Sequence, residues 1–169
     1  MNSGRLELEP ATFDLIGLLN DTLAALELVS TYAKAPLRLT APESLTCTLD
    51  RLAVEQVIDN IVSNALKYGA GAPIEVTATV VEGENVVLAV RDHGPGMDAE
   101  DCARIFERFE QAVGQRSHGG FGIGLWLSRE LVEAMEGSIA VDSAVGEGTT
   151  FTVRLPVSMK KANEGQAAT

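Results

Sequence analysis

Two asparagines and a lysine recur at helical spacing in the segment from Asn60 to Tyr68. Positions three and four apart share one face of a helix, so Asn60, Asn64 and Lys67 are expected to form one polar stripe. An asparagine carbonyl is an oxygen ligand for magnesium, and a lysine ammonium is a point charge for phosphate. The stripe therefore predicts a site for a hard cation and phosphate oxygens.

An aspartate at the end of an apolar strand pattern predicts which base this site would take. Asp92 precedes a turn in which Gly94 and Gly96 leave room for the backbone to approach a flat ligand. A carboxylate accepts hydrogen bonds but cannot donate them, so it matches the exocyclic amine of adenine and repels the carbonyl of guanine. The site is therefore expected to prefer ATP to GTP. Taken alone, the same residues also fit an ordinary turn.

A glycine-rich segment, Gly119 to Gly124, leads into another helical pattern. The backbone amides of such a segment and the dipole of the helix after it can hold phosphate. The segment is not a dinucleotide fingerprint, because the Gly-x-Gly-x-x-Gly spacing fails at Leu125 or Leu127, and the chain contains no P-loop motif. A flexible linker is the alternative, but the Gly124-Leu125 step into an amphipathic helix favours a fixed turn.

Two groups of residues near this segment have competing interpretations. The stretch from Phe106 to Phe109 fits a hydrophobic clamp on a lid, with Arg108 available to a terminal phosphate. It fits equally well a short helix that packs two aromatic rings into the core. His93 and His118 each lie in a glycine-rich loop without a spaced partner, which favours solvent-facing histidines over catalytic ones.

The elements that position these residues follow from the spacing of apolar residues and from turn signals. Strands are predicted over seven ranges: 5–9, 37–40, 46–49, 73–81, 85–90, 138–143 and 149–157. Helices are predicted over 15–35, 51–68 and 123–135, with a short helical stretch over 101–109. These elements predict an α+β fold, a two-layer α/β sandwich with three helices packed on one face of a mixed, mostly antiparallel sheet.

The composition of the chain is that of one globular domain of 169 residues with a net charge of −11. Its basic residues are scattered, so nucleic acid is not an expected partner. No apolar run approaches the roughly 18 residues of a membrane helix and no secretory signal is evident, so a cytoplasmic location is expected, with membrane anchoring of a parent protein left open. Cys47 and Cys102 are expected to be reduced structural thiols.

In this order and spacing, the segments resemble the N, G1, F and G2 boxes of the catalytic ATP-binding domain of sensor histidine kinases, in the Bergerat-fold (GHKL) superfamily. The resemblance implies this domain over residues 1–157, a disordered tail over 158–169, and ATP and Mg²⁺ as cofactors. It implies that Asn64 with Asn60 holds the metal, and that Asn60, Lys67 and Arg108 serve catalysis. The residues implied to bind the nucleotide are Asn60, Asn64, Lys67, Tyr68, Asp92, Gly94, Gly96, Met97, Phe106, Gly120, Phe121, Gly122, Ile123, Gly124, Leu125 and Thr149.

One position within this resemblance separates reaction types. In hydrolytic members of the superfamily, a glutamate that activates water lies one helical turn before the magnesium asparagine, and Asn60 occupies that position here. An amide cannot act as a base, so phosphoryl transfer to a protein is favoured over ATP hydrolysis. The chain has no histidine in a helix like that of the phosphoacceptor. A histidine-bearing dimerisation domain, upstream or in another chain, is therefore the implied partner.

The resemblance thus implies transfer of the γ-phosphoryl group to that histidine in two-component signal transduction, with a response regulator served indirectly. We expect the fragment to be monomeric, a parent protein to be a homodimer, and the isolated domain to lack autophosphorylation. Two alternatives remain open: an anti-sigma-type serine/threonine kinase, and a nucleotide-binding regulatory domain without catalysis. The F box argues against the first, and the complete set of boxes argues against the second.

Overall fold

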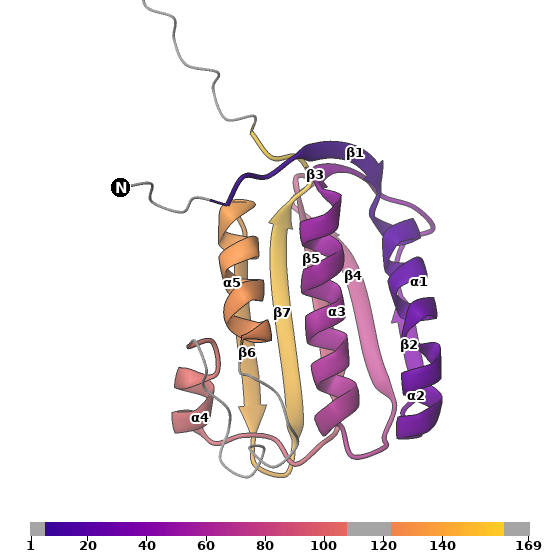
Figure 1. Cartoon of the computed structure of the whole chain (residues 1–169), viewed down its shortest axis with the longest axis vertical. Coiled ribbons are helices and arrows are strands. Elements are labelled where there is room, and N and C mark those ends of the chain that lie inside the picture. The colour runs from indigo at the N-terminus through magenta and orange to yellow at the C-terminus, as the bar shows by residue number, and fades with distance from the viewer. Residues whose placement is uncertain (1–5, 108–122, 161–169) are drawn as a thin grey trace, which may run out of the picture.

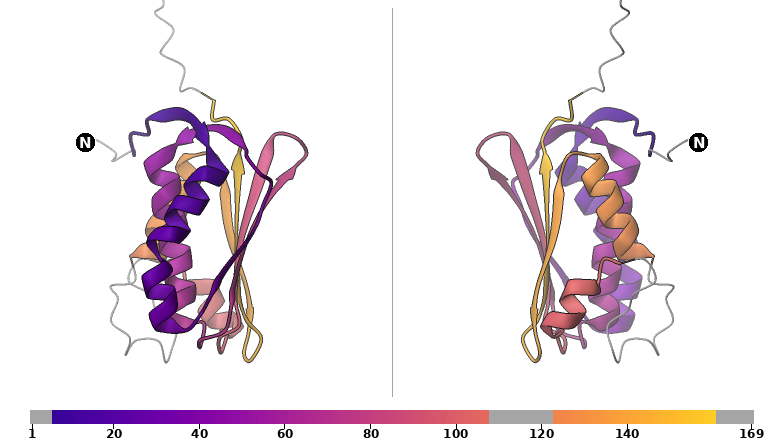
Figure 2. Two further views of the ribbon diagram at one scale, coloured as in Figure 1. Left: turned by 90° about the vertical axis from the view of Figure 1, so that its right-hand side faces the viewer. Right: turned by 90° about the vertical axis from the view of Figure 1, so that its left-hand side faces the viewer.

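A computed structural model of the chain describes residues 6–107 and 123–160, which form a layer of helices over a layer of strands (Figures 1 and 2). The strands are β1 (Pro10–Asp14), β2 (Leu37–Thr40), β3 (Thr46–Asp50), β4 (Ile74–Val81), β5 (Asn85–Asp92), β6 (Ser138–Ala144) and β7 (Gly148–Pro156). The helices are α1 (Leu15–Ala25), α2 (Glu27–Ala33), α3 (Arg51–Tyr68), α4 (Ala99–Arg104) and α5 (Gly124–Ala134).

The main sheet has five strands in the order β2-β4-β5-β7-β6. Only β2 and β4 are parallel, and the other neighbouring pairs are antiparallel. Helices α1, α2, α3 and α5 lie on one side of this sheet, and no described element covers its other side (Figure 2). The predicted two-layer sandwich with a mixed, mostly antiparallel sheet is therefore confirmed.

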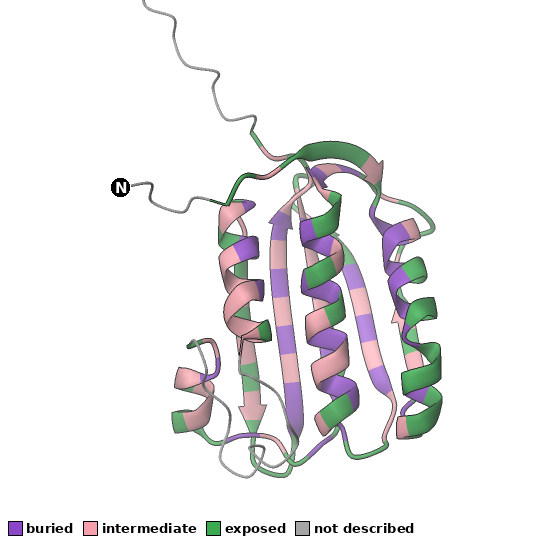
Figure 3. Ribbon diagram, viewed as in Figure 1, coloured by how far each residue is buried: buried purple, intermediate pink, exposed green. Residues whose placement is uncertain are grey.

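The core lies between the two layers, where every second residue of the central strands is buried (Figure 3). In β7 these residues are Phe151, Val153 and Leu155, which face the helices. Helix α3 runs across the middle of the sheet and buries an apolar stripe of its own (Ala53, Val54, Val57, Ile58, Ile61, Val62, Ala65 and Leu66). Helix α3 is thus held along its length, which sets the positions from which the polar side chains of its other face extend.

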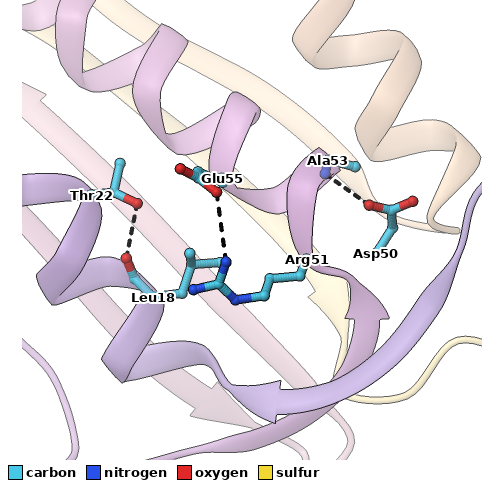
Figure 4. Close-up of polar contacts among 6 residues, drawn as sticks. All are labelled: Leu18, Thr22, Asp50, Arg51, Ala53 and Glu55. Atoms are coloured by element: carbon cyan, nitrogen blue, oxygen red, sulfur yellow. Dashed lines mark hydrogen bonds and ion pairs between the residues drawn. The ribbon is translucent and has the colours of Figure 1, made fainter. Parts of the chain in front are cut away.

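Side-chain hydrogen bonds fix the starts of two helices. Asp50 accepts a hydrogen bond of 2.9 Å from the backbone N–H of Ala53 at the start of α3 (Figure 4). Asp14 accepts one of 3.1 Å from Ile16 at the start of α1, as its capping role predicts. Within α1 the buried Thr22 hydroxyl donates to the Leu18 carbonyl at 2.8 Å, so burial leaves this hydroxyl with a partner (Figure 4).

Three predicted elements were wrong in extent. The short helical stretch predicted over 101–109 is α4, which begins at Ala99 and ends at Arg104. The helix predicted over 15–35 is two helices, because the chain turns at Leu26, whose φ of −93° and ψ of 0° break the helix while its side chain stays buried. The strand predicted over 5–9 lies over Pro10–Asp14 instead, paired antiparallel with β3 in a separate two-stranded sheet. Proline can begin a strand because its missing N–H is not needed there.

The residues after β7 extend the small sheet of β1 and β3. The N–H of Thr48 donates to the Val157 carbonyl at 2.8 Å, and the N–H of Met159 donates to the Thr48 carbonyl at 2.9 Å. Both ends of the described chain therefore lie at the same end of the molecule (Figure 1). Residues 161–169 of the predicted tail lie outside the described residues. No helix in the described part of the chain is both long enough and apolar enough to cross a membrane.

Candidate functional site

The predicted polar stripe lies on α3, which extends from Arg51 to Tyr68 as the spacing requires. Asn60 and Asn64 are half-buried and Lys67 is exposed, with its Nζ atom 5.3 Å from the centre of the Tyr68 ring. A cation over an aromatic face is an attractive arrangement. The structure thus places two amides and an ammonium group on one helix, next to an aromatic ring at its end.

The amide nitrogen of Asn60 joins α3 to the start of α5. It donates hydrogen bonds of 3.2 Å to the Gly124 carbonyl and 3.2 Å to the Ser128 hydroxyl. Ser128 is completely buried and donates to the same carbonyl at 2.8 Å. These contacts bring together the two predicted site residues Asn60 and Gly124, which are 64 positions apart. Neither bond of Asn60 uses its carbonyl oxygen, so this atom is the one that could serve a metal.

Asp92 lies at the end of β5 with its side chain buried, at 4% exposure. Its carboxylate accepts a hydrogen bond of 2.9 Å from the N–H of Gly94 and another from the N–H of Thr149, which is paired with it across β5 and β7. Burial raises the pKa of Asp92 above its ordinary value of 3.8, although these two backbone bonds and the nearby His93 lower it. The Asp92 carboxylate is therefore a buried hydrogen-bond acceptor at the end of a strand, as the sequence predicted.

The raised pKa of Asp92 predicts how binding and stability change with pH. The folded chain holds this proton more tightly than the unfolded chain, so ionised Asp92 lowers the free energy of unfolding. This reduction in the free energy of unfolding is absent below pH 3.8 and complete above the raised pKa. Binding of an amine to the ionised carboxylate should weaken as the pH falls through the same raised pKa. Calorimetric titrations with ATP over a pH series should show a loss in the wild type that Asp92→Asn lacks, and an identical loss in both would contradict the assignment.

The glycines of the turn after Asp92 are required by close contacts within the protein. A Cβ atom on Gly94 would overlap the carbonyl oxygen of Tyr68 at the end of α3. Gly96 has a φ of +70°, and a Cβ atom there would overlap the carbonyl oxygen of Ala144. The sequence suggested room for a ligand at these positions. The structure adds that the turn packs directly on α3 and on the end of β6.

Met97, Phe106 and Leu125 meet in a small apolar cluster next to the main core. Met97 is buried, and the Phe106 ring packs edge-on against Phe151 with 6.1 Å between ring centres. Of the two interpretations of Phe106, this contact fits packing into the core. Ile123 lies at the start of α5. Four predicted site residues lie outside the described residues: Arg108, Gly120, Phe121 and Gly122. Phe109 and His118 lie outside them too.

Sequence reasoning missed two serines that bond to predicted site residues. Ser128 contacts Asn60 and Gly124 as described above, and the Ser143 hydroxyl accepts a hydrogen bond of 2.9 Å from the N–H of Met97. Ser143 lies in β6, 46 positions from Met97, so no local spacing could have indicated it. It also lies 2.8 Å from the Thr149 hydroxyl, next to Asp92 in the sheet.

The remaining ionisable residues offer little for a metal. Within the described ranges, no group of three or more histidines, cysteines, aspartates or glutamates could hold an ion. His93 is partly exposed, with Nε2 3.4 Å from a carboxylate oxygen of Glu75. Cys47 and Cys102 are free thiols, as predicted, and burial raises the pKa of Cys47 to about 11. A metal at the stripe would therefore rely on amide oxygens and on a ligand's own phosphates, which suits the few protein ligands that magnesium takes.

Residues 49–159 match the family model of histidine kinase-, DNA gyrase B- and HSP90-like ATPases. The alginate biosynthesis sensor protein KinB of Pseudomonas aeruginosa is 38% identical to the chain over 157 residues, which cover 92% of the chain and 26% of KinB. The sensor protein EvgS of Escherichia coli (strain K12) is 29% identical over 167 residues, which cover 95% of the chain and 14% of EvgS. The chain thus spans about a quarter or less of the length of these relatives.

Two solved structures have a similar arrangement of elements. Full-length ShkA in complex with AMPPNP superposes with a TM-score of 0.81 and 28% identity, covering 90% of the chain and 32% of ShkA. The nucleotide-free catalytic domain of the histidine kinase ThkA superposes with a TM-score of 0.79 over 89% of the chain and 97% of that domain. The identity with ThkA is 23%, so this second likeness concerns the fold alone.

Proposed function

Because the chain belongs to the family of histidine kinase-, DNA gyrase B- and HSP90-like ATPases and has the Bergerat fold that its sequence predicted, we propose that it is the catalytic domain of a histidine kinase. It binds Mg-ATP and transfers the γ-phosphoryl group to a histidine on a separate dimerisation domain, upstream in a parent chain or in another chain. The domain covers residues 1–157, and a response regulator receives the phosphoryl group in a later step.

The observation that carries this proposal is that α3 contacts both ends of the predicted site. At one end, Asn60 is hydrogen-bonded to Gly124, where the glycine-rich segment enters α5. At the other end, the backbone carbonyl of Tyr68 lies against Gly94, in the turn that follows Asp92. The helical rise separates Asn60 from Tyr68 by about 12 Å along the axis. A nucleotide can therefore lie along α3, with its base at Asp92 and its phosphates toward Asn60 and Asn64.

The residues of the stripe suit magnesium and phosphate. Asn64, with Asn60, would hold the ion through amide oxygens, and the bound ion would neutralise charge on the phosphates. The amide nitrogen of Asn60 donates to two acceptors on α5, which sets the orientation of the amide, and its carbonyl oxygen takes part in neither bond. Lys67 adds a positive charge, and Arg108 is proposed to do the same from outside the described residues.

The contacts of Asn60 also support transfer rather than hydrolysis. Its amide nitrogen donates to the Gly124 carbonyl, which can only accept. A glutamate at this position would have no proton to donate there and would bring its charge toward a carbonyl oxygen. The asparagine thus suits a site that lacks a base for water and keeps ATP intact until an acceptor arrives.

Incubation of the chain alone with radiolabelled Mg-ATP tests this proposal. We expect no label on the chain, because the acceptor histidine is supplied by a partner. We also expect only slow release of phosphate, because Asn60 occupies the position of the catalytic base and an amide cannot act as a base. Gel autoradiography measures the first and a phosphate assay the second. Strong self-labelling would point to an acceptor within the chain, and rapid release would point to a hydrolase.

A further inference from the structure

Three polar side chains form a row across the end of the sheet. Asp92 of β5 is paired with Thr149 of β7, and Thr149 is paired with Ser143 of β6. Paired residues of neighbouring strands point to the same face of a sheet, so all three side chains face the helical layer. Asp92 and Thr149 are buried, at 4% and 7% exposure. Because these side chains are close together, the donor and acceptor in one hydrogen bond determine those in the next.

The protons of this row can be counted. A serine hydroxyl has one proton and two lone pairs. Ser143 is 2.8 Å from the Gly148 carbonyl, which cannot donate, so the single proton of Ser143 lies on that bond. The N–H of Met97 occupies one lone pair of Ser143 at 2.9 Å. In the 2.8 Å contact between the two hydroxyls, Thr149 must therefore be the donor and Ser143 the acceptor.

This count fixes what Thr149 can offer to a ligand. Its one hydroxyl proton is used toward Ser143, so only its lone pairs remain. Next to it, the Asp92 carboxylate is already an acceptor and takes a backbone N–H from Thr149 itself. The end of the sheet thus presents two acceptors side by side. An exocyclic amine carries two N–H groups, whereas a carbonyl at the same position carries none.

We propose that Ser143 is a specificity-determining residue, which holds the Thr149 hydroxyl as an acceptor beside Asp92 and so makes the site select a 6-aminopurine over a 6-oxopurine. Ser143 acts through Thr149 and does not itself touch the base. The inference rests on the proposed function, because it assumes that the base of ATP lies at Asp92. Without the Ser143 hydroxyl, the Thr149 proton is free to turn toward a 6-oxo group, and the selection against that group weakens.

The test compares the affinities for ATP and inosine triphosphate, measured by calorimetry with magnesium on the full chain. Ser143→Ala should reduce the preference for ATP by about three- to ten-fold, the effect of one neutral hydrogen bond. Ser143→Thr, which retains a hydroxyl, should restore the preference. The matched control is Ser138→Ala, which removes an exposed hydroxyl from the same strand and should leave the preference for ATP unchanged.

Thr149→Val provides a second route that does not depend on Ser143→Ala being folded. It removes the acceptor itself and should reduce the ratio of the ATP affinity to the inosine triphosphate affinity. Thr149→Ser, which retains the hydroxyl, should leave this ratio unchanged. The inference is wrong if Ser143→Ala weakens both nucleotides equally, which is the result of a purely structural role, or if Thr149→Val leaves the ratio unchanged. A wild-type chain that binds neither nucleotide would instead refute the proposed function.

Discussion

Replacing Asp92 with asparagine is expected to weaken ATP binding by at least ten-fold. The carboxylate is buried and already oriented by the N–H groups of Gly94 and Thr149. A hydrogen bond to a charged group contributes about 1.5 to 3 kcal/mol, which corresponds to roughly ten- to a hundred-fold in affinity. The amide also places a donor where a second acceptor stood, opposite an amine that can only donate. Isothermal titration calorimetry with ATP measures the loss.

A second aspartate of the same sheet provides the matched control for this variant. Asp142 lies in β6 with its side chain exposed, so Asp142→Asn removes the same charge without changing the buried row. We expect its affinity for ATP to equal that of the wild type. Circular dichroism should show that both variants are folded. A folded Asp92→Asn protein with wild-type affinity would remove Asp92 from the base site.

Replacing Asn64 with alanine should remove the contribution of magnesium to ATP binding. Asn64 is half-buried on α3, one turn after Asn60, and the described part of the chain has no acidic cluster that could take its place. Loss of a residue that supports a metal site typically costs about 10- to 100-fold in affinity or activity. We therefore expect magnesium to tighten ATP binding to the wild type, and to have little effect on Asn64→Ala. The affinity in the presence of a chelator should be similar for both proteins.

Asn20 gives the control for this substitution. It lies exposed on α1, away from the stripe, and its side chain donates to the Ile16 carbonyl of its own helix. Asn20→Ala should respond to magnesium as the wild type does. If Asn64→Ala retains the full response, then another group holds the ion and the assignment of the stripe is wrong.

The positions of Asn60, Asn64 and Asp92 could be predicted because each depends on a local pattern. Helical spacing places the asparagines on one face of α3, and alternating burial places Asp92 at the inward-facing end of β5. Gly94 and Gly96 were predicted to form a turn because glycines directly after a strand are also a local pattern. Their packing partners, Tyr68 and Ala144, come from other elements, so the sequence could suggest space for a ligand but not these contacts.

The features that could not be predicted are contacts between distant parts of the chain. Ser128 and Ser143 are ordinary residues of a helix and a strand, and only the packing of α5 on α3 and the pairing of β6 with β7 bring them to the site. The turn at Leu26 has no glycine or proline to signal it. The register of β1 depends on β3, more than thirty residues later.

The central claim is that this chain is one half of a phosphoryl-transfer reaction and that a histidine on a partner domain is the other half. The most direct measurement mixes the chain and radiolabelled Mg-ATP with a helical, histidine-bearing acceptor domain, and compares it with the same domain carrying a His→Ala substitution. We predict acid-labile, alkali-stable label on the first domain, none on the second, and at least ten-fold less label when the chain carries Asp92→Asn and ATP is kept below its dissociation constant. Label on a serine of the acceptor, or equal labelling of both domains, would contradict the claim.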